Sequence, residues 1–254
     1  MKLNKQKEAS ARHNSGRRIL LKISGEALQD TGASSFLSAD TIERIVLEII
    51  PAIEIGIEVG VVVGGGNLFR GAALSQTGIS RVSADQMGML GTIINALALR
   101  DIFEKHQQVA RVMSAIPMSG VVDHYDRRKA MHHLSLGRVV IFAGGTGNPF
   151  VTTDSAASLR AIELNADLLA KASNVDGIYN QDPKLPGDHI RFDKITYRDA
   201  VINELKVMDL AAFCQCRDHN LPLRVFNINS PGAITRLLLG ENEGTLVFNS
   251  DKGE

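Results

Sequence analysis

The feature that most constrains this chain is a buried strand that ends in a glycine loop and leads into a helix. Residues 139–142 form a short apolar run rich in β-branched and aromatic side chains, typical of a strand buried on both faces. Residues 144–149, GGTGNP, follow, and side chains this small allow another molecule close to the backbone. Hydroxyl or carboxylate groups in residues 152–155 can then cap a helix. Together these parts predict an anion site at the carboxyl edge of a parallel sheet.

Two familiar phosphate-binding motifs do not fit the glycine-rich segments. The dinucleotide pattern G-x-G-x-x-G, started at Gly145, meets Phe150 where the third glycine belongs. Residues 66–71 are followed by Ala72, where a P-loop requires lysine. The loop at residues 144–149 is therefore either an ordinary strand-to-helix turn or a phosphate site of another kind, and we favour the second interpretation.

Two lysines near the ends of predicted strands also suit an anion. Lys22 lies near the carboxyl end of residues 18–24, and Lys171 lies near the carboxyl end of residues 166–173. Lysine is normally excluded from a buried strand, because desolvation of an ammonium group is costly. Taken alone, Lys22 is better explained by a side chain that reaches solvent beside the turn.

A third predicted strand, residues 58–63, ends in three consecutive glycines, residues 64–66. Their N–H groups form a row of donors that a phosphate can enter, and Arg70 can add a bidentate contact. A simple turn has no use for three successive residues of such high entropic cost. Here a functional interpretation is clearly preferred.

Strands and helices alternate along the chain. The predicted strands are residues 18–24, 58–63, 109–116, 139–142, 166–173, 223–227 and 245–248. The predicted helices include residues 38–56, 84–105, 126–136, 197–204, 209–218 and 232–239, with a further helix after the loop that ends near residue 155. This order predicts one doubly wound α/β domain with a mostly parallel sheet over residues 17–250, after a flexible tail of residues 1–16.

Composition sets the class of protein. A chain of 254 residues with 44% hydrophobic residues can fill a substantial core. Its 28 basic and 28 acidic residues balance, so no global field attracts nucleic acid or an anionic membrane, and a phosphate partner must be held locally. No segment approaches the length of apolar sequence that a membrane span needs, so we expect no membrane partner. Aromatic residues are sparse and tryptophan is absent, which argues against base-stacking platforms, so we expect no nucleic-acid partner.

Nothing in the sequence indicates a disulfide or a metal held by the protein alone. Cys214 and Cys216 are two residues apart in a predicted helix, so their side chains point away from each other. His132 and His133 are neighbours in another predicted helix and diverge, which is poor spacing for metal ligands. We expect a cytoplasmic protein in a reducing compartment.

The predicted helix of residues 84–105 is apolar on almost every side, which is typical of a buried helix or of an oligomer interface. Asp85 falls in its first turn. On sequence alone Asp85 is better interpreted as a helix cap than as a ligand-binding residue.

The two lysines and the two glycine clusters all lie at the carboxyl ends of different strands, the edge where open parallel sheets bind ligands. Together with Arg70 and Asp154 they suit a substrate with several phosphates, because phosphoryl transfer mostly requires positioning and neutralisation of charge. No Ser/His/Asp or Cys/His set is evident. This fits an anionic acceptor, since a phosphate needs no general base at neutral pH, whereas a sugar hydroxyl would.

At this point the motifs resemble those of bacterial uridylate kinases, a branch of the amino acid kinase family. The resemblance covers nearly everything after the tail and rests on LLKISGEAL (20–28), GVVVGGGNLFRG (60–71), SAIP (114–117), GTGNPFVTTDSAA (145–157), KASNVDGIY (171–179), ELKVMDLAAF (204–213) and LRVFN (223–227). The wider family shares the lysine and glycine ends, whereas GTGNPF and KVMDLAAF are similar to the uridylate branch.

The resemblance implies a three-layer αβα sandwich of the carbamate kinase-like fold and an enzyme of pyrimidine biosynthesis. That enzyme transfers the γ-phosphoryl group of MgATP to UMP, giving UDP and ADP. Members of this branch are usually homohexamers, and GTP activation and UTP inhibition belong to the same pattern. Residues 30–36, DTGASSF, depart from it, because they replace a glycine-rich stretch tied in some relatives to activation by GTP.

The same resemblance implies the site residues. The catalytic set is Lys22, Lys171, Asp154 and Arg70, with Asp154 orienting the lysines or the magnesium environment. The ATP-binding set is Lys22, Ile23, Ser24, Gly25, Gly66, Arg70, Ser173, Tyr179 and Asp182; Ser173 stands where threonine or asparagine is expected. The UMP-binding set is Gly65, Asp85, Thr146, Gly147, Asn148, Pro149, Phe150, Val151, Thr152 and Thr153, which reverses the cap interpretation of Asp85.

Three alternatives remain at this stage. An acetylglutamate or carbamate kinase would use the same crevice for a carboxylate-type acceptor, but Asp85 and the GTGNPFVTT loop favour a nucleotide. A nucleotide sensor would bind ATP without turnover, yet the presence of both Lys22 and Lys171 argues against it. A purely structural assembly protein leaves the glycine clusters unexplained.

Overall fold

The computed structural model describes residues 16–30, 35–69, 78–183, 185–205 and 207–250. The predicted tail up to residue 15, the predicted contact residue Arg70 and part of the departing segment 30–36 lie outside these ranges. Among the described helices, none combines the length and apolar character needed to cross a membrane.

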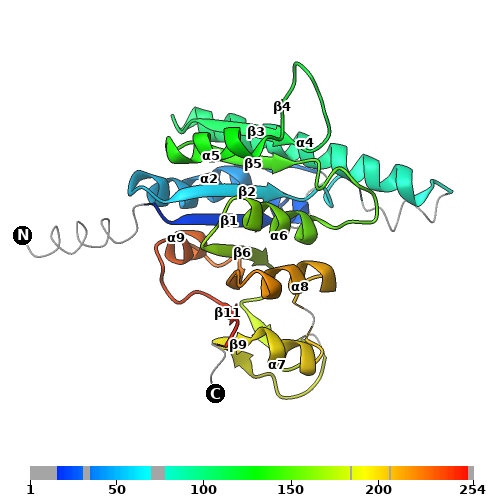
Figure 1. Ribbon diagram of the computed structural model, residues 1–254, viewed down its shortest axis with the longest axis vertical. Helices are drawn as coiled ribbons and strands as arrows, with labels where there is room; N and C mark the ends of the chain where they lie inside the picture. The colour runs from blue at the N-terminus through cyan, green and yellow to red at the C-terminus, as the bar shows by residue number, and fades with distance from the viewer. Residues whose placement is uncertain (1–15, 31–34, 70–77, 184, 206, 251–254) are drawn as a thin grey trace, which may run out of the picture.

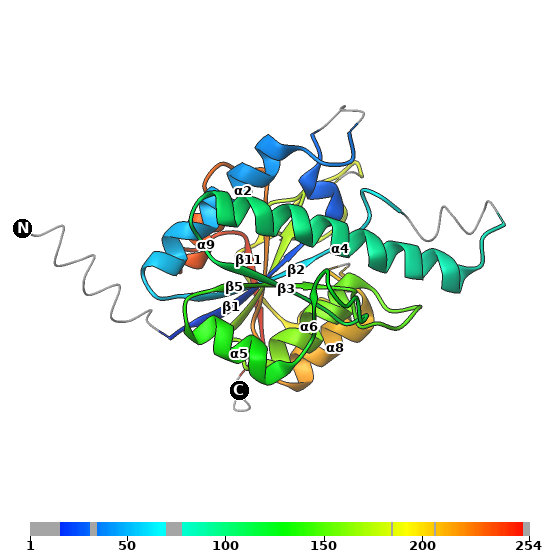
Figure 2. The ribbon, with the colours of Figure 1, turned by 90° about the horizontal axis from the view of Figure 1, so that it is seen from above.

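A sheet of nine strands forms the middle layer, in the order β4-β3-β5-β2-β1-β6-β10-β11-β9 (Figure 1). All neighbouring strands are parallel except β10 and β11. Helices α2, α4 and α9 cover one face, and α5, α6 and α8 cover the other (Figure 2). The predicted three-layer α/β sandwich is thereby confirmed.

The strands of the large sheet are β1 (Arg18–Ile23), β2 (Glu58–Val63), β3 (Ala110–Ser114), β4 (Asp123–His124), β5 (Val139–Ala143), β6 (Leu168–Ser173), β9 (Lys194–Thr196), β10 (Leu223–Asn227) and β11 (Thr245–Phe248). A two-stranded sheet pairs β7 (Ile178–Tyr179) with β8 (Arg191–Phe192). The helices are η1 (Gly25–Leu28), α2 (Ala39–Glu54), α4 (Arg81–Lys105), α5 (Arg127–Ser135), α6 (Thr153–Glu163), α7 (Tyr197–Ile202), α8 (Leu210–Asp218) and α9 (Ala233–Leu238).

The alternation of side chains along the central strands decides which face each residue serves. In β1, Ile19, Leu21 and Ile23 pack into the core beneath α2, α4 and α9, whereas Leu20 packs on the opposite side. Successive strand residues point to opposite faces, so Lys22 lies on the side of Leu20, beneath α6. The same count along β6 puts Lys171 on that side. Strand periodicity therefore directs both ammonium groups toward one helix.

The helices begin where short polar side chains replace missing backbone partners. Ser38, Ser80, Thr152 and Asp209 cap α2, α4, α6 and α8, and each accepts a hydrogen bond from an N–H group of the first helical turn. The cap at Thr152 matches the predicted capping region. It places the N-terminus of α6 directly after the glycine loop that follows β5.

The start of α4 corrects the sequence interpretation of Asp85. We expected the helix to begin at residue 84, but it begins at Arg81, because the Ser80 hydroxyl accepts a hydrogen bond from Ser83 N at 3.2 Å. Asp85 consequently lies beyond the first turn and does not cap the helix. The short strands β4, β7, β8 and β9 were not predicted, because two or three residues are too few to show a period of two.

Phe103 tests the packing of α4 against the sheet. It is fully buried in the core beneath α2 and α4, so we expect Phe103→Ala to lower the free energy of unfolding by about 3–5 kcal/mol through lost contacts and a cavity. Urea denaturation followed by circular dichroism measures this loss. Leu136→Ala is the control, because Leu136 is 53% exposed, and equal losses in the two variants would contradict this account of the core.

Candidate active site

A bridge of three charges lies at the carboxyl edge of the sheet. Lys22 and Lys171 are register partners on the adjacent parallel strands β1 and β6. Lys22 Nζ lies 2.8 Å from Asp154 Oδ1, and Lys171 Nζ donates a hydrogen bond to Asp154 Oδ2 at 2.6 Å. Asp154 is in the first turn of α6, so the loop that precedes this helix sets its position. The structure therefore brings the two predicted lysines to a single carboxylate.

Burial makes this bridge electrostatically strong. The three side chains are only 12–15% exposed. Burial by itself raises the pKa of Asp154, but the charges of Lys22 and Lys171 outweigh it and hold that pKa below its ordinary value. Desolvation lowers the pKa of Lys171, and Asp154 opposes that effect. Asp154 thus stays ionised and keeps two like charges close together.

The glycine segment after β2 packs tightly against the start of η1. A Cβ atom on Gly25 would lie 2.8 Å from Gly66 N and 2.9 Å from Gly64 O, which is closer than real Cβ contacts allow. Gly65 is equally confined by α4, because a Cβ atom there would overlap the carbonyl oxygen of Gly88. These glycines are required for close approach of backbone to backbone, and the approach brings Gly25 next to the glycine segment.

Two adjoining cavities open at these glycines. The central cavity, of about 260 Å³, is lined by Lys22, Ser24, Gly25, Glu26 and Asp154 together with residues 64–66 and 152–153. The α4 cavity, of about 280 Å³, is lined by Asp85, Gly145, Asn148, Val151 and further residues of α4. The two cavities share Gly65, Gly66, Thr152 and Thr153, so a ligand group in one lies next to a group in the other.

The N-terminus of α6 is held by a residue that the sequence analysis did not select. Asp209, the cap of α8, accepts hydrogen bonds from the hydroxyls of Thr152 and Ser155. Thr152 in turn accepts from the N–H groups of Asp154 and Ser155. Asp209 thus fixes the helix end that carries Asp154. Its sequence signals were its place at the start of the helix predicted at residues 209–218 and its place in the motif ELKVMDLAAF.

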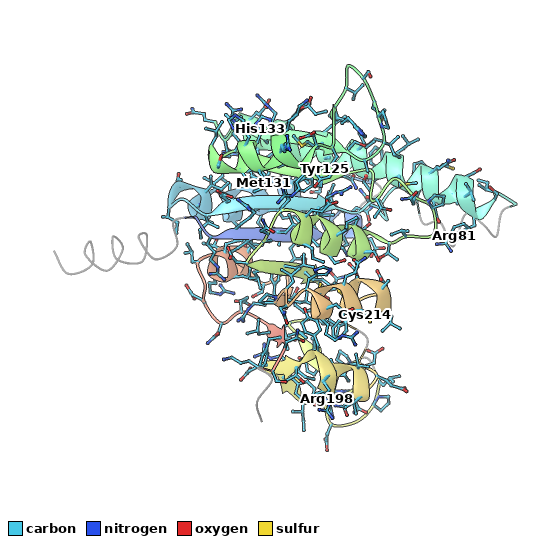
Figure 3. All side chains as sticks on the ribbon, in the orientation of Figure 1. Arg81, Tyr125, Met131, His133, Arg198 and Cys214 are labelled. Atoms are coloured by element: carbon cyan, nitrogen blue, oxygen red, sulfur yellow. The ribbon has the colours of Figure 1, made fainter. Side chains whose placement is uncertain are left out.

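Asp85 connects α4 to the glycine loop before α6. Its carboxylate accepts a hydrogen bond from Arg81 Nε and one from Phe150 N, each at 2.8 Å. Partial burial opposes the effect of these bonds, yet they lower the pKa of Asp85. Phe150 has a φ of 65°. The Arg81 guanidinium lies 5.6 Å from the centroid of the Phe150 ring. Arg81 itself is on the protruding start of α4 (Figure 3). Asp85 therefore holds a strained loop residue in place.

A third and larger cavity lies beyond β6. This β6–β10 cavity, of about 520 Å³, is lined by Ser173, Tyr179, Asp182, Val207, Val225 and residues between them. The Tyr179 hydroxyl donates to Asp176 Oδ1 at 2.7 Å. Lys171 connects the cavity to the charged bridge, because its Nζ also donates to Val207 O at 2.7 Å. The three cavities thus follow the strand order along one edge of the sheet.

The remaining predicted residues are placed as follows. The side chain of Ile23 is buried in the core on the α2 side, away from Lys22, and its carbonyl accepts from Gly64 N at 2.8 Å. Thr146, Gly147 and Pro149 belong to the same loop as Asn148, and the Thr146 hydroxyl accepts from Asn148 N at 3.3 Å. Arg70 lies outside the described residues.

Two polar residues of α4 were also missed. Thr92 and Asn95 are 3% and 0% exposed and contact the glycine segments that follow β5 and β2. The sequence shows them only as two polar positions in a helix that is otherwise largely apolar. The described residues contain no group of three or more His, Cys, Asp or Glu side chains arranged to hold a metal ion.

The structure is that of an α/β protein built to bind polyphosphates. Its sheet is open and mostly parallel, and two lysines, two glycine segments and a helix N-terminus lie at the carboxyl edge. Comparison with known proteins makes this class specific. Residues 17–227 match the profile of the Amino acid kinase family, and the chain belongs to that family. The uridylate kinase of Coxiella burnetii is 54% identical over 238 residues, which cover 94% of this chain and 96% of that protein.

Solved structures agree in fold. The crystal structure of UMP kinase from Bacillus anthracis has a TM-score of 0.88 and 44% sequence identity, and the match covers 92% of this chain and 96% of that one. UMP kinase from Ureaplasma parvum has a TM-score of 0.87 at 35% identity, covering 92% and 99%. The resemblance drawn from the motifs is thereby confirmed.

The charged bridge predicts how stability changes with pH. Because the folded-state pKa of Asp154 is below its ordinary value of 3.8, the bridge stabilises the fold above that value and loses its contribution as the pH falls below it. We expect wild-type protein to lose more unfolding free energy than Asp154→Asn between about pH 5 and about pH 3 in urea titrations. Asp123→Asn, at an exposed carboxylate, should keep the wild-type dependence; parallel curves for wild type and Asp154→Asn would refute the assignment.

Proposed function

We propose that this chain transfers the γ-phosphoryl group of ATP to UMP, giving UDP and ADP. The single observation that carries the proposal is the bridge in which Asp154 holds Lys22 and Lys171. This bridge lies between the α4 cavity and the β6–β10 cavity. The printed names of the relatives, uridylate kinase and UMP kinase, supply the identity of the acceptor. Such a kinase belongs to pyrimidine nucleotide biosynthesis.

We assign the acceptor to the α4 cavity and the donor nucleoside to the β6–β10 cavity. Asp85 and the loop of residues 146–153 then bind UMP, and Ser173, Tyr179 and Asp182 bind the ATP nucleoside. The phosphates of both nucleotides meet in the central cavity, beside Gly25, Gly66 and Lys22. The order of the cavities along the sheet edge supports this assignment. The central cavity lies between the other two, so the phosphates of ATP and of UMP can both reach it.

The chemistry of the transfer follows from the fixed charges. As the phosphoryl group moves, negative charge shifts from the acceptor oxygen to the leaving oxygen. Lys22 and Lys171, fixed by Asp154 on adjacent strands, neutralise this charge without having to move, and the N-terminus of α6 adds its positive end. The attacking oxygen of UMP is a phosphate oxygen that is already ionised at neutral pH, so no general base is required.

Magnesium enters as part of the donor in this proposal. In the described residues two carboxylate side chains line the central cavity, Glu26 and Asp154. Asp154 is already shared by two lysines, and within the part of the chain that the structure describes no carboxylate cluster offers an all-protein site. Mg²⁺ bound to the triphosphate would neutralise its oxygens and orient the transferred group. Asp154 would then influence the metal through the lysines.

Self-association and regulation extend the proposal. Leu90 and Ile94 on α4 are 43% and 42% exposed in the single chain, and these apolar side chains support assembly into a homohexamer through that helix. Activation by GTP and inhibition by UTP are proposed from the family pattern alone. We also propose a cytoplasmic location, where both substrates and a reducing environment are available.

The alternative acceptors are less well supported. An acetylglutamate or carbamate kinase needs a site for a small carboxylate-type acceptor. Here Asp85 and the loop of residues 146–153 line the α4 cavity, which we assign to a nucleotide acceptor. A nucleotide sensor would not need two lysines on one carboxylate. The named relatives are uridylate kinases.

An acceptor comparison tests the proposed reaction. We expect purified protein to form ADP from MgATP with UMP at least about 10²-fold faster than with CMP or AMP, because the loop of residues 146–153 is the element that reads the base. A coupled assay of ADP release measures these three acceptors together with acetylglutamate and carbamate. Faster turnover with acetylglutamate or carbamate, or none with any acceptor, would refute the proposal.

A lysine variant tests the role of the bridge. Lys171→Met keeps the aliphatic stem but removes the charge, so we expect kcat to fall by about 10²- to 10³-fold while the circular dichroism spectrum stays unchanged. Lys194→Met is the matched control, because Lys194 is an exposed lysine on strand β9 of the same sheet. Equal activity of the two variants would remove Lys171 from the mechanism.

A further inference from the structure

Helix α4 carries two buried polar side chains, each of which contacts a different glycine segment of the crevice. Thr92 Oγ1 accepts a hydrogen bond from Gly144 N at 2.7 Å. Asn95 Nδ2 donates to Gly64 O, also at 2.7 Å. Thr92 is 3% exposed and Asn95 is 0% exposed. Polar groups buried this deeply are costly unless they are paired, so their partners are tightly specified.

Thr92 makes two hydrogen bonds at the wall of the α4 cavity, which it also lines. Its hydroxyl donates to Met89 O at 2.7 Å within α4 and accepts from Gly144 N. Gly144 has a φ of 73° and begins the loop that ends at the cap of α6. Gly144 packs closely against the end of β3, because a Cβ atom there would lie 2.7 Å from Ser114 Oγ. Thr92 therefore fixes the first residue of the loop that lines the α4 cavity.

Asn95 forms a reciprocal pair with a residue of the other glycine segment. Asn95 Nδ2 donates to Asn67 Oδ1 at 2.7 Å, and Asn67 Nδ2 donates to Asn95 Oδ1 at 3.0 Å. Asn67 Nδ2 also donates to Phe36 O at 2.7 Å. The pair thus holds residues 64–67 against α4 on one side and against the segment before α2 on the other.

We propose that Thr92 and Asn95 are positioning residues for the phosphoryl transfer, with separate tasks. Thr92 positions the acceptor loop through Gly144. Asn95 positions the glycine segment of residues 64–66, which lines both the α4 cavity and the central cavity. Loss of the Thr92 contact therefore weakens use of UMP alone, whereas loss of the Asn95 contact weakens use of UMP and ATP together. This inference rests on the proposed function.

The Thr92 test uses three variants. Thr92→Val keeps the shape of the side chain but removes the hydroxyl, so KM for UMP should rise by about five- to tenfold while KM for ATP changes by less than about twofold. Thr92→Ser keeps the hydroxyl and should restore the wild-type KM for UMP. Thr235→Val is the matched control, because the Thr235 hydroxyl donates to Glu48 O and serves the packing of α9 on α2.

The Asn95 test uses one isosteric change and its control. Asn95→Asp replaces the donor that faces Gly64 O with an acceptor, so kcat/KM should fall by about tenfold for UMP and for ATP alike. Because Asp also buries a carboxyl group, the comparison is made on protein whose circular dichroism spectrum matches that of the wild type. Asn249 makes the same kind of contacts away from the crevice, since its Nδ2 donates to Arg217 O and Asn220 Oδ1, each at 2.6 Å. Asn249→Asp should leave both values unchanged.

The outcomes separate the inference from the proposed function. Wild-type protein that forms ADP with UMP establishes the function whatever the variants do. Equal effects of Thr92→Val and Thr92→Ser, parallel changes of both KM values in Thr92→Val, or a change confined to one substrate in Asn95→Asp would overturn the positioning roles. Wild-type protein without UMP-dependent turnover would overturn the function itself.

Discussion

The carboxylate of Asp154, held between the ammonium groups of Lys22 and Lys171, is the interaction on which the site depends. Parallel pairing of β1 with β6 puts the two lysines at the same height on neighbouring strands, where their charges repel. Two largely buried ammonium groups so close together are stable only with an anion between them. Asp154 supplies one, and it leaves an excess positive charge directed at the cavity where phosphates are proposed to meet.

The rest of the crevice supports that bridge from several elements. Asp209 fixes the N-terminus of α6 through the hydroxyls of Thr152 and Ser155. Helix α4 contacts the glycine segments through Thr92 and Asn95 and the acceptor loop through Asp85. These supports come from helices on both faces of the sheet. The loops of the open edge are therefore hydrogen-bonded to helices of both layers, which suits a reaction that depends on fixed charge.

The sequence patterns predicted most of the fold and much of the site. The predicted strands 58–63 and 223–227 agree with the structure. Short runs rich in β-branched and apolar residues are typical of buried strands. The very short strands β4 and β7 could not be predicted, since pairing partners create them. On the residues alone Asp85 was interpreted as a helix cap, because a carboxylate near a helix start is usually one, and the resemblance assigned it to UMP instead. The hydrogen bond that it accepts from Phe150 N is visible only in the structure. Thr92 and Asn95 were missed because polar residues in an apolar helix carry no local signal of what they contact.

What the sequence by itself determined is the alternation of side chains along the strands and the positions of the glycine segments that follow two of them. A period of two puts alternate residues of each strand on opposite faces, and glycines mark where β2 and β5 stop. The tertiary structure alone decided that β1 lies between β2 and β6, so that the two lysines meet on one carboxylate. Strand order depends on how two layers of helices pack across the whole sheet. That packing is a long-range property, which no local pattern in the chain encodes.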